Sequence, residues 1–248
     1  MDVFIDAITW IFSPERLQGT NTLPDRVGEH LWFTVISVAI AAVIAVPSGY
    51  LIGHTGKGRE IAVAISGAAR ALPSFGLILL LVLMLGVVRV SLAAIIAFVL
   101  LAIPSILAGA YTGIQAIDRQ VVEAARAVGM TEWQILYKVE IPLGLPLLIG
   151  GLRSAALQVV ATVTLAAYVG LGGLGYDILQ GLQVRSFDQM LGSAIVVILL
   201  ALLIDGLFGL LQKLVVPRGV TAGKVTDLRS APTRRRPVVG MPTEPERG

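Results

Sequence analysis

Five blocks of apolar residues, each long enough to cross a lipid bilayer, constrain this chain more than any other feature of its sequence. They cover about residues 31–53, 61–86, 91–111, 145–169 and 189–212. A helix needs roughly 20 apolar residues to cross about 30 Å of hydrocarbon. Only 14% of the 248 residues are charged, whereas soluble domains average about 25%. The sequence therefore predicts an all-α polytopic membrane protein with five transmembrane helices.

The two ends of the chain differ from these blocks. Residues 1–27 begin with "MDVFIDAITWIF", which lacks the basic region and cleavage site of a signal peptide. We expect them to form an extracytoplasmic or interfacial segment. Residues 28–216 form the predicted transmembrane domain. Residues 217–248 form a basic tail rich in Pro and Gly, predicted to be disordered and to anchor the topology at anionic membrane lipid.

The positive charge of the chain is localised in this tail. The tail has a net charge of +4 and the whole chain has a net charge of +3, so the other 216 residues carry −1. They offer no basic face for nucleic acid. Basic residues near membrane helices concentrate on the cytoplasmic side. With the N-terminus outside, thirteen basic residues flank the spans on the inside and four on the outside. The distribution predicts an N-out/C-in topology.

One short charged stretch, between the third and fourth apolar blocks, has the signals of two capped helices. Asp118 can cap a helix that ends at Gly129, because glycine supplies the left-handed position of a helix end. Thr131 and Gln134 have the spacing of a capping box, which starts a second helix. That helix must stop just before Pro142. The predicted object is a pair of short amphipathic helices at an angle, joined by a glycine and facing the cytoplasm.

Two interpretations of this stretch are open, a loop that lies on the membrane and a docking surface for another protein. A passive loop needs neither two caps nor a rigid exit. Small side chains at Ala124, Ala125 and Ala127 let another surface approach closely. The pattern favours docking.

The same stretch resembles the EAA motif of ABC importer permeases. The residues that carry the resemblance are Glu123-Ala124-Ala125, Gly129 and Val139-x-Ile141-Pro142. In that family the segment is the coupling helix, which sits on a cytoplasmic ATPase. The resemblance implies the permease fold of type I ABC importers. It also implies that the coupling residues are Glu123, Ala124, Ala125, Arg126, Gly129 and Pro142. The chain has no G-x-x-x-x-G-K-[ST] phosphate loop, so we expect ATP and Mg to be bound by a separate subunit and no cofactor by this chain.

Three further stretches resemble the osmoprotectant branch of this family, which imports glycine betaine, choline, carnitine and related quaternary amines. They are "ARALPSFGLI", "AGAYTGI" and "ATVTLAAYVGLGGLGYDILQGL". The family implies an extracytoplasmic substrate-binding protein and a second permease subunit, identical or related. Methionine importers share the five-span plan and a similar glycine-rich outer loop, so they remain an alternative.

Two other classes of protein fit less well. A secondary transporter would need intramembrane acids and inverted repeats, and only Asp205 is available. An enzyme would need a clustered nucleophile, base or metal site, and the sequence has none and contains no cysteine. We therefore expect no catalytic residue and no metal site.

The glycine-rich stretch "GLGGLG" at residues 170–175 follows a membrane helix rather than a strand, so we do not interpret it as a dinucleotide site. It predicts an irregular turn near the outer face, with Gly172 and Gly173 either in an outer gate or in simple helix packing. Tyr168 precedes it and is a candidate for the transport path, although aromatic residues in spans more often pack or anchor the protein at the interface.

The second apolar block contains both a charge and a proline. Arg70 lies about 14 Å into the block by helical rise, near the middle of the membrane. A charge at that depth is a candidate path residue or part of a structural ion pair. If Arg70 faces the path, it favours a zwitterion over a cation. Pro73 interrupts the block, and Ser74 follows as a candidate path residue.

Arg153 and Asp205 each lie roughly 12 Å inside their blocks, at equal depth. Since an unpaired charge there is costly, we expect a structural ion pair. The spacings Gly109-x-x-x-Gly113 and Gly206-x-x-Gly209 predict helix packing. His30 and His54 lack metal-ligand spacing and are interpreted as boundary residues.

Overall fold

The computed structural model describes residues 2–215, so the predicted tail at 217–248 lies outside the described residues. Over these residues the chain is helical and contains no strand. The elements in order are α1 (Asp2–Ile11), α2 (Pro14–Leu17), α3 (Leu23–Thr55), α4 (Arg59–Ala71), α5 (Ser74–Leu85), η1 (Val87–Arg89), α6 (Val90–Gln115), α7 (Arg119–Ala127), α8 (Glu132–Ile135), η2 (Leu136–Glu140), α9 (Ile141–Ala166), η3 (Ala167–Val169), α10 (Leu174–Val184) and α11 (Phe187–Val215).

Four of the five predicted spans are continuous and apolar enough to cross a membrane. They are Leu23–Thr55, Val87–Gln115, Glu132–Val169 and Phe187–Val215. The second predicted span is broken where Pro73 was expected to interrupt it. There α4 and α5 meet at an angle of 89°, because the residue before a proline is driven out of the helical region, and Leu72 is extended with ψ 131°.

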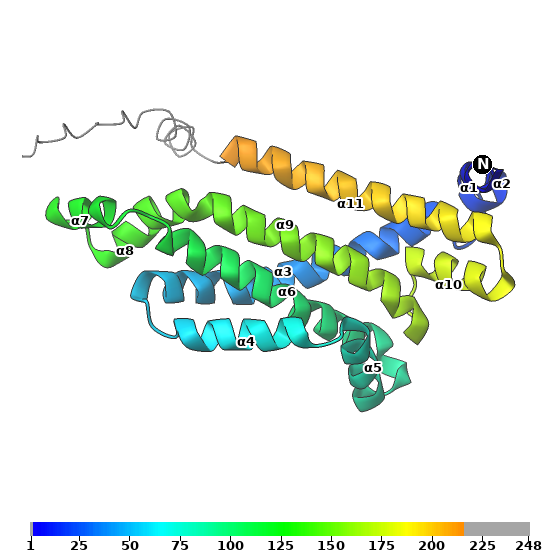
Figure 1. Cartoon of the computed structure of the whole chain (residues 1–248), viewed down its shortest axis with the longest axis horizontal. Coiled ribbons are helices and arrows are strands. Elements are labelled where there is room, and N and C mark those ends of the chain that lie inside the picture. The colour runs from blue at the N-terminus through cyan, green and yellow to red at the C-terminus, as the bar shows by residue number, and fades with distance from the viewer. Residues whose placement is uncertain (1, 216–248) are drawn as a thin grey trace, which may run out of the picture. The chain divides into compact units, whose positions relative to one another are not determined.

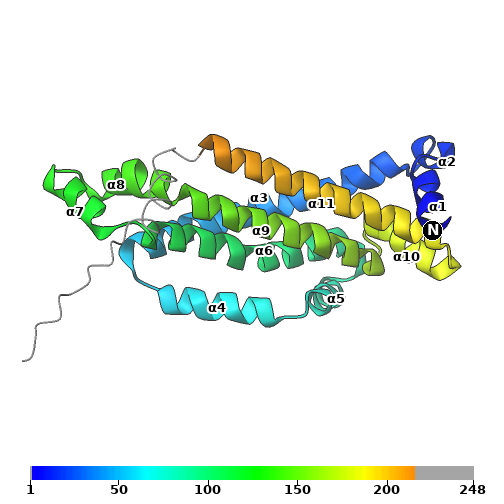
Figure 2. The same cartoon turned by 45° about the horizontal axis from the view of Figure 1, so that its top comes forward.

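The long helices α3, α6 and α9 lie side by side and build the main core (Figure 2). Glycines face each other across the pair of α6 and α9. A Cβ at Gly109 would lie 2.7 Å from the Leu147 carbonyl oxygen, and one at Gly113 would lie 2.6 Å from that of Gly144. The packing predicted for this spacing is confirmed. The packing predicted for Gly206 and Gly209 is wrong within the described residues. No atom of another helix lies within 4 Å of the position of a Cβ at either glycine.

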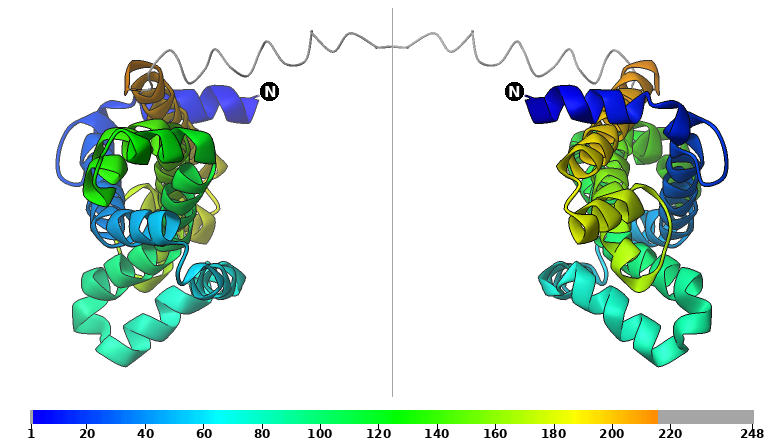
Figure 3. Two further views of the ribbon diagram at one scale, coloured as in Figure 1. Left: turned by 90° about the vertical axis from the view of Figure 1, so that its left-hand side faces the viewer. Right: turned by 90° about the vertical axis from the view of Figure 1, so that its right-hand side faces the viewer.

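A second apolar cluster joins α11 to α9, α10 and the N-terminal helix. Leu200 and Ile204 of α11 pack with Val160 of α9 and Leu174 of α10. In the end views of Figure 3, α1 crosses α11, and Gly192 provides the space for the Trp10 ring. The N-terminal segment is therefore helical over α1, and one side of this helix is packed on protein.

The second short helix does not stop before Pro142, so that prediction is wrong. The α-helical bonds of α8 end at Ile135, and the chain continues through the π-helix η2 directly into α9. The Ile141 N–H donates to the Leu136 carbonyl, five residues earlier. Such wide turns occur as single insertions in α-helices, often at functional sites. The helix therefore continues through a wider turn at this point and does not end.

Candidate functional site

The stretch predicted to dock another protein forms a distinct element at one end of the helices, which we call the docking element (residues 118–140). Figure 1 shows α7 and α8 at this end and α1, α2 and α10 at the opposite end. Asp118 caps α7 by accepting from the Gln120 N–H at 2.9 Å. Thr131 and Gln134 form the predicted capping box of α8.

Gly129 sets the angle between the two short helices. Its φ is +85°, the left-handed region that favours glycine. The Met130 N–H donates to the Ala125 carbonyl and the Gly129 N–H to the Arg126 carbonyl, at 3.2 and 2.9 Å. These two bonds are a Schellman motif, which satisfies carbonyls at the end of a helix. The hinge is therefore fixed by hydrogen bonds.

The outer surface of the docking element is apolar and exposed. Val128 is 79% exposed, and the small residues Ala124 and Ala127 are exposed beside it. Trp133 and Tyr137 are stacked with ring centroids 6.0 Å apart, and both are 63% exposed. Exposed aromatic and apolar residues of this kind are typical of protein interfaces. Of the predicted docking alanines only Ala125 is buried.

A chain of four charged or titratable side chains links the docking element to α3. The Arg126 guanidinium donates two hydrogen bonds to the Glu132 carboxylate, at 2.8 and 2.9 Å. His54, in the last turn of α3, has its Nε2 3.5 Å from Glu132 and its Nδ1 2.6 Å from Glu140. The hydrogen bond to Glu132, and to a smaller extent the negative charge of Glu132, raise the pKa of the Arg126 guanidinium above its ordinary value. The side chains connect α7, α8, α3 and η2.

A polar cavity of about 620 Å³ opens beside this chain. Its lining includes His54, Arg59, Arg119, Glu123, Arg126 and Glu140. The motif residue Glu123 therefore faces the space between α7 and the end of α3, in company with three arginines.

The candidate path residues near the α4–α5 break lie partly together. Pro73 precedes the first turn of α5, which starts at Ser74. Phe75 and Tyr168 meet edge to face, with ring centroids 5.4 Å apart, so Tyr168 of η3 is brought to the start of α5. Arg70 is exposed, and within residues 2–215 it forms no ion pair.

The glycine-rich turn lies against the first part of α3. The Gly173 N–H donates to the Glu29 carboxylate at 2.7 Å, and a Cβ at Gly172 would overlap that carboxylate. Gly173 has φ +79°, and a Cβ there would be 3.3 Å from His30 Nδ1. His30 is fully buried and contacts the Val160 carbonyl through Nε2 at 3.0 Å, so it is a core residue.

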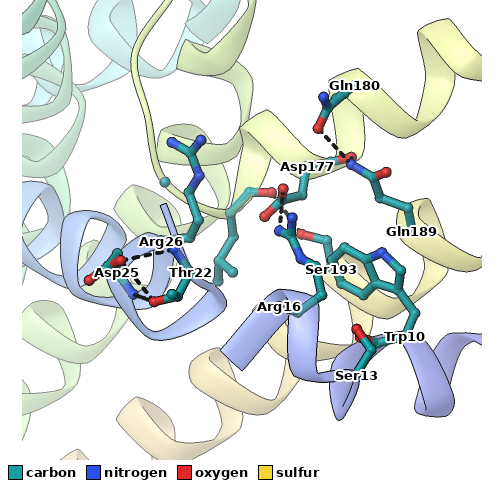
Figure 4. Close-up of polar contacts among 12 residues, drawn as sticks. Trp10, Ser13, Arg16, Thr22, Asp25, Arg26, Asp177, Gln180, Gln189 and Ser193 are labelled. Atoms are coloured by element: carbon teal, nitrogen blue, oxygen red, sulfur yellow. Dashed lines mark hydrogen bonds and ion pairs between the residues drawn. The ribbon is translucent and has the colours of Figure 1, made fainter. Parts of the chain in front are cut away.

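Figure 4 shows the polar contacts at this end of the molecule. The Arg16 guanidinium, from α2, pairs with Asp177 of α10 at 2.6 Å and lies 4.5 Å from the Trp10 ring centre. Burial raises the pKa of the Asp177 carboxyl, and the charge of Arg16 opposes that shift. Arg26 lies over the Tyr176 ring at 4.2 Å. The N-terminal segment is thereby tied to α10.

Arg153 of α9 and Asp205 of α11 are in direct contact through two hydrogen bonds. The pairing expected from their equal depth is present. It joins α11 to the middle of α9.

Sequence reasoning interpreted His54 only as a boundary residue and missed its pairing with Glu140, and it missed the aromatic pair of Trp133 and Tyr137. His54 and Glu140 are 86 residues apart, so no spacing rule connects them. The signal that was available is the lone Glu140 directly before an apolar span, since a carboxylate there requires a partner.

Comparison with known proteins identifies relatives along most of the chain. Residues 26–219 match the family "binding-protein-dependent transport system inner membrane component". A glycine betaine/carnitine/choline transport system permease protein of Bacillus subtilis is 32% identical over 199 residues, which are 80% of this chain and 91% of that protein. A carnitine transport permease protein of Listeria monocytogenes is 33% identical, covering 87% of this chain and 96% of the relative.

A solved structure has the same fold. It is the methionine ABC transporter MetNI in an inward-facing conformation, with 26% identity and a TM-score of 0.68. The alignment covers 79% of this chain and 96% of that one.

Proposed function

Because the chain belongs to the family of binding-protein-dependent transport system inner membrane components, we propose that it is the permease subunit of an ABC importer for quaternary amines. The substrate class comprises glycine betaine, carnitine, choline and similar compounds. The relative that is 32% identical is named for glycine betaine, carnitine and choline, and the relative that is 33% identical is named for carnitine. The subunit lies in the cytoplasmic (inner) membrane and is not the catalytic component. A separate ATPase subunit binds and hydrolyses ATP.

The docking element is the observation that carries this proposal. It is rigid, since both helices are capped and the hinge is hydrogen-bonded. Its outer surface is exposed at Val128, Trp133 and Tyr137. It is also joined to α6 by the short turn at residues 116–118 and, through η2, is continuous with α9. A push on this surface by a closing ATPase dimer therefore enters two core helices directly, and packed helices convert such shifts into discrete rearrangements.

The exposed face of α4 is the argument for a second permease subunit, identical or related, in the assembled transporter. Arg70 lies near the middle of the membrane by helical rise, and a charge facing lipid at that depth is costly. Arg70 is exposed on this subunit, so in the assembled protein it faces a partner subunit or the water-filled path. The path then runs along α4 and the α4–α5 break, beside Phe75 and Tyr168. An extracytoplasmic binding protein delivers the substrate at the opposite end.

Site-specific cross-linking tests the proposal, since the chain contains no cysteine. A single cysteine at Val128 should cross-link to a co-expressed ABC ATPase. A cysteine at Leu83 of α5, also 79% exposed, is the matched control and should not. A preparation in which neither position cross-links contradicts the docking role.

The substrate class is tested by uptake into proteoliposomes that contain the complete transporter. ATP-dependent uptake of radiolabelled glycine betaine, carnitine or choline is the expected result. Uptake of methionine with none of these compounds would place the chain with the methionine importers, to which its fold is similar.

A further inference from the structure

His54 occupies a position that neither the family motif nor the docking surface explains. Its ring lies between two carboxylates, with Nδ1 2.6 Å from Glu140 and Nε2 3.5 Å from Glu132. Its side chain is 14% exposed and that of Glu140 is 6% exposed. A carboxylate buried to this degree needs a hydrogen-bonding partner, and among the described contacts His54 is the side chain that provides it.

The contacts of His54 join parts of the chain that are far apart in sequence. Glu132 begins α8 and Glu140 ends the π-helix η2, whereas His54 lies in the last turn of α3. Glu132 is bound in turn by Arg126 of α7. Within residues 2–215, every hydrogen bond or ion pair between the docking element and α3 involves His54. His54 therefore provides the polar attachment of α3 to the docking element, with a polar cavity opening beside it.

The other end of α3 is attached to the glycine-rich turn. Glu29 accepts a hydrogen bond from the Gly173 N–H, and the buried His30 packs beneath Gly173. The 25 residues from Glu29 to His54 span about 38 Å as one helix. A single helix, which contains Pro47 in its interior, thus touches both the surface proposed to receive the ATPase and the turn for which either an outer gate or simple helix packing was predicted.

We propose that His54 is a positioning residue that makes α3 move with the docking element, so that α3 carries the ATPase-driven displacement to the glycine-rich turn. This inference rests on the proposed function. It adds α3 as a third route into the membrane, beside the direct connections to α6 and α9. A structural role alone would require only that Glu140 be paired. A transmission role requires that the docking element and the far end of α3 respond together.

The test measures ATP hydrolysis and movement in the same assembled transporter. Spin labels on cysteines at Val35 of α3 and Val184 of α10, both exposed, report on the end with the glycine-rich turn. We expect nucleotide to change their distance in the otherwise unchanged protein. His54→Ala should keep ATPase binding and hydrolysis, should lose most of this distance change, and should lower substrate transported per ATP at least tenfold. Lys57→Ala removes an exposed cation from the same end of the molecule and should behave like the unchanged protein.

Three results separate the possibilities. An unaltered distance change and transport ratio in His54→Ala overturns the inference and leaves the proposed function intact. Loss of ATPase binding also overturns it, because His54 would then act in docking. If the otherwise unchanged protein itself shows no nucleotide response and no cross-link at Val128, the proposed function fails. Should His54→Ala not fold, Glu140→Gln keeps the shape of the side chain, weakens the same contact and is assessed by the same measurements.

Discussion

Substitution of Gly113 by alanine tests whether the two helices that lead into and out of the docking element must touch through their backbones. A Cβ at Gly113 would lie 2.6 Å from the Gly144 carbonyl oxygen, whereas ordinary contacts begin at 3.4 Å. Either α6 and α9 separate locally by almost 1 Å or the overlap persists. Overpacking of this kind costs about 1–3 kcal/mol. Replacing glycine in a helix interior by alanine returns roughly 0.5–1 kcal/mol, so we expect a net loss of about 1–2 kcal/mol.

The assay is thermal unfolding of the detergent-solubilised subunit, with Gly206→Ala as the matched control. Gly206 is also in a helix interior, but no heavy atom lies within 4 Å of the position of its Cβ. Chains of this length lose about 2–4 °C in Tm per kcal/mol. Gly113→Ala should therefore melt several degrees lower, and Gly206→Ala at the same temperature or slightly higher. Equal melting temperatures for the two variants would refute the argument that backbone contact sets the spacing of α6 and α9.

Three shorter predictions concern the opposite end and the path. Burial raises the folded-state pKa of Asp177 above the unfolded value of about 3.9. The contribution of this group to the free energy of unfolding is therefore greatest at low pH and falls as the pH rises. The Tm of the unchanged protein minus the Tm of Asp177→Asn should decrease from pH 4 to pH 7. Gly173→Val should abolish uptake while ATPase co-purification persists, because its φ of +79° is strained for valine, and Gly206→Val, in open space on α11, should transport normally. Arg70→Ala should raise choline uptake relative to glycine betaine uptake, and an unchanged ratio would place Arg70 away from the path.

The local signals in the sequence predicted the docking element closely. The caps at Asp118 and Thr131 and the left-handed Gly129 depend on hydrogen bonds between residues two to five positions apart. Such bonds are decided by the identities of neighbouring residues, so one sequence is enough to predict them. The prediction that the second helix stops before Pro142 was wrong because it also relied on a local rule. The sequence rule for proline describes an α-helix, and here the chain changes to a π turn.

Long-range contacts could be predicted only where burial in an apolar span left a charged side chain few possible partners. The pair of Arg153 and Asp205 could be predicted because two charges at equal depth in apolar spans have few alternatives. His54 and Glu140 lie at the end of a span, where water competes as a partner, and nothing in the sequence indicates which side chain approaches. The contact of Glu29 with the Gly173 N–H involves a backbone donor, which no pattern of side chains reveals.

The distribution of packing indicates which parts of the molecule move together. The apolar stretch of α6 is 61% buried, whereas that of α11 is 6% buried. The core between α3, α6 and α9 contains many alanines, with Ala41, Ala97 and Ala110 fully buried, so these helices approach closely. Movement is then easiest at the α4–α5 break, where Leu72 is half exposed. A displacement of the docking element would reach α6 and α9 through the chain and α3 through His54, and the exposed α4, which carries Arg70, would change its position relative to them.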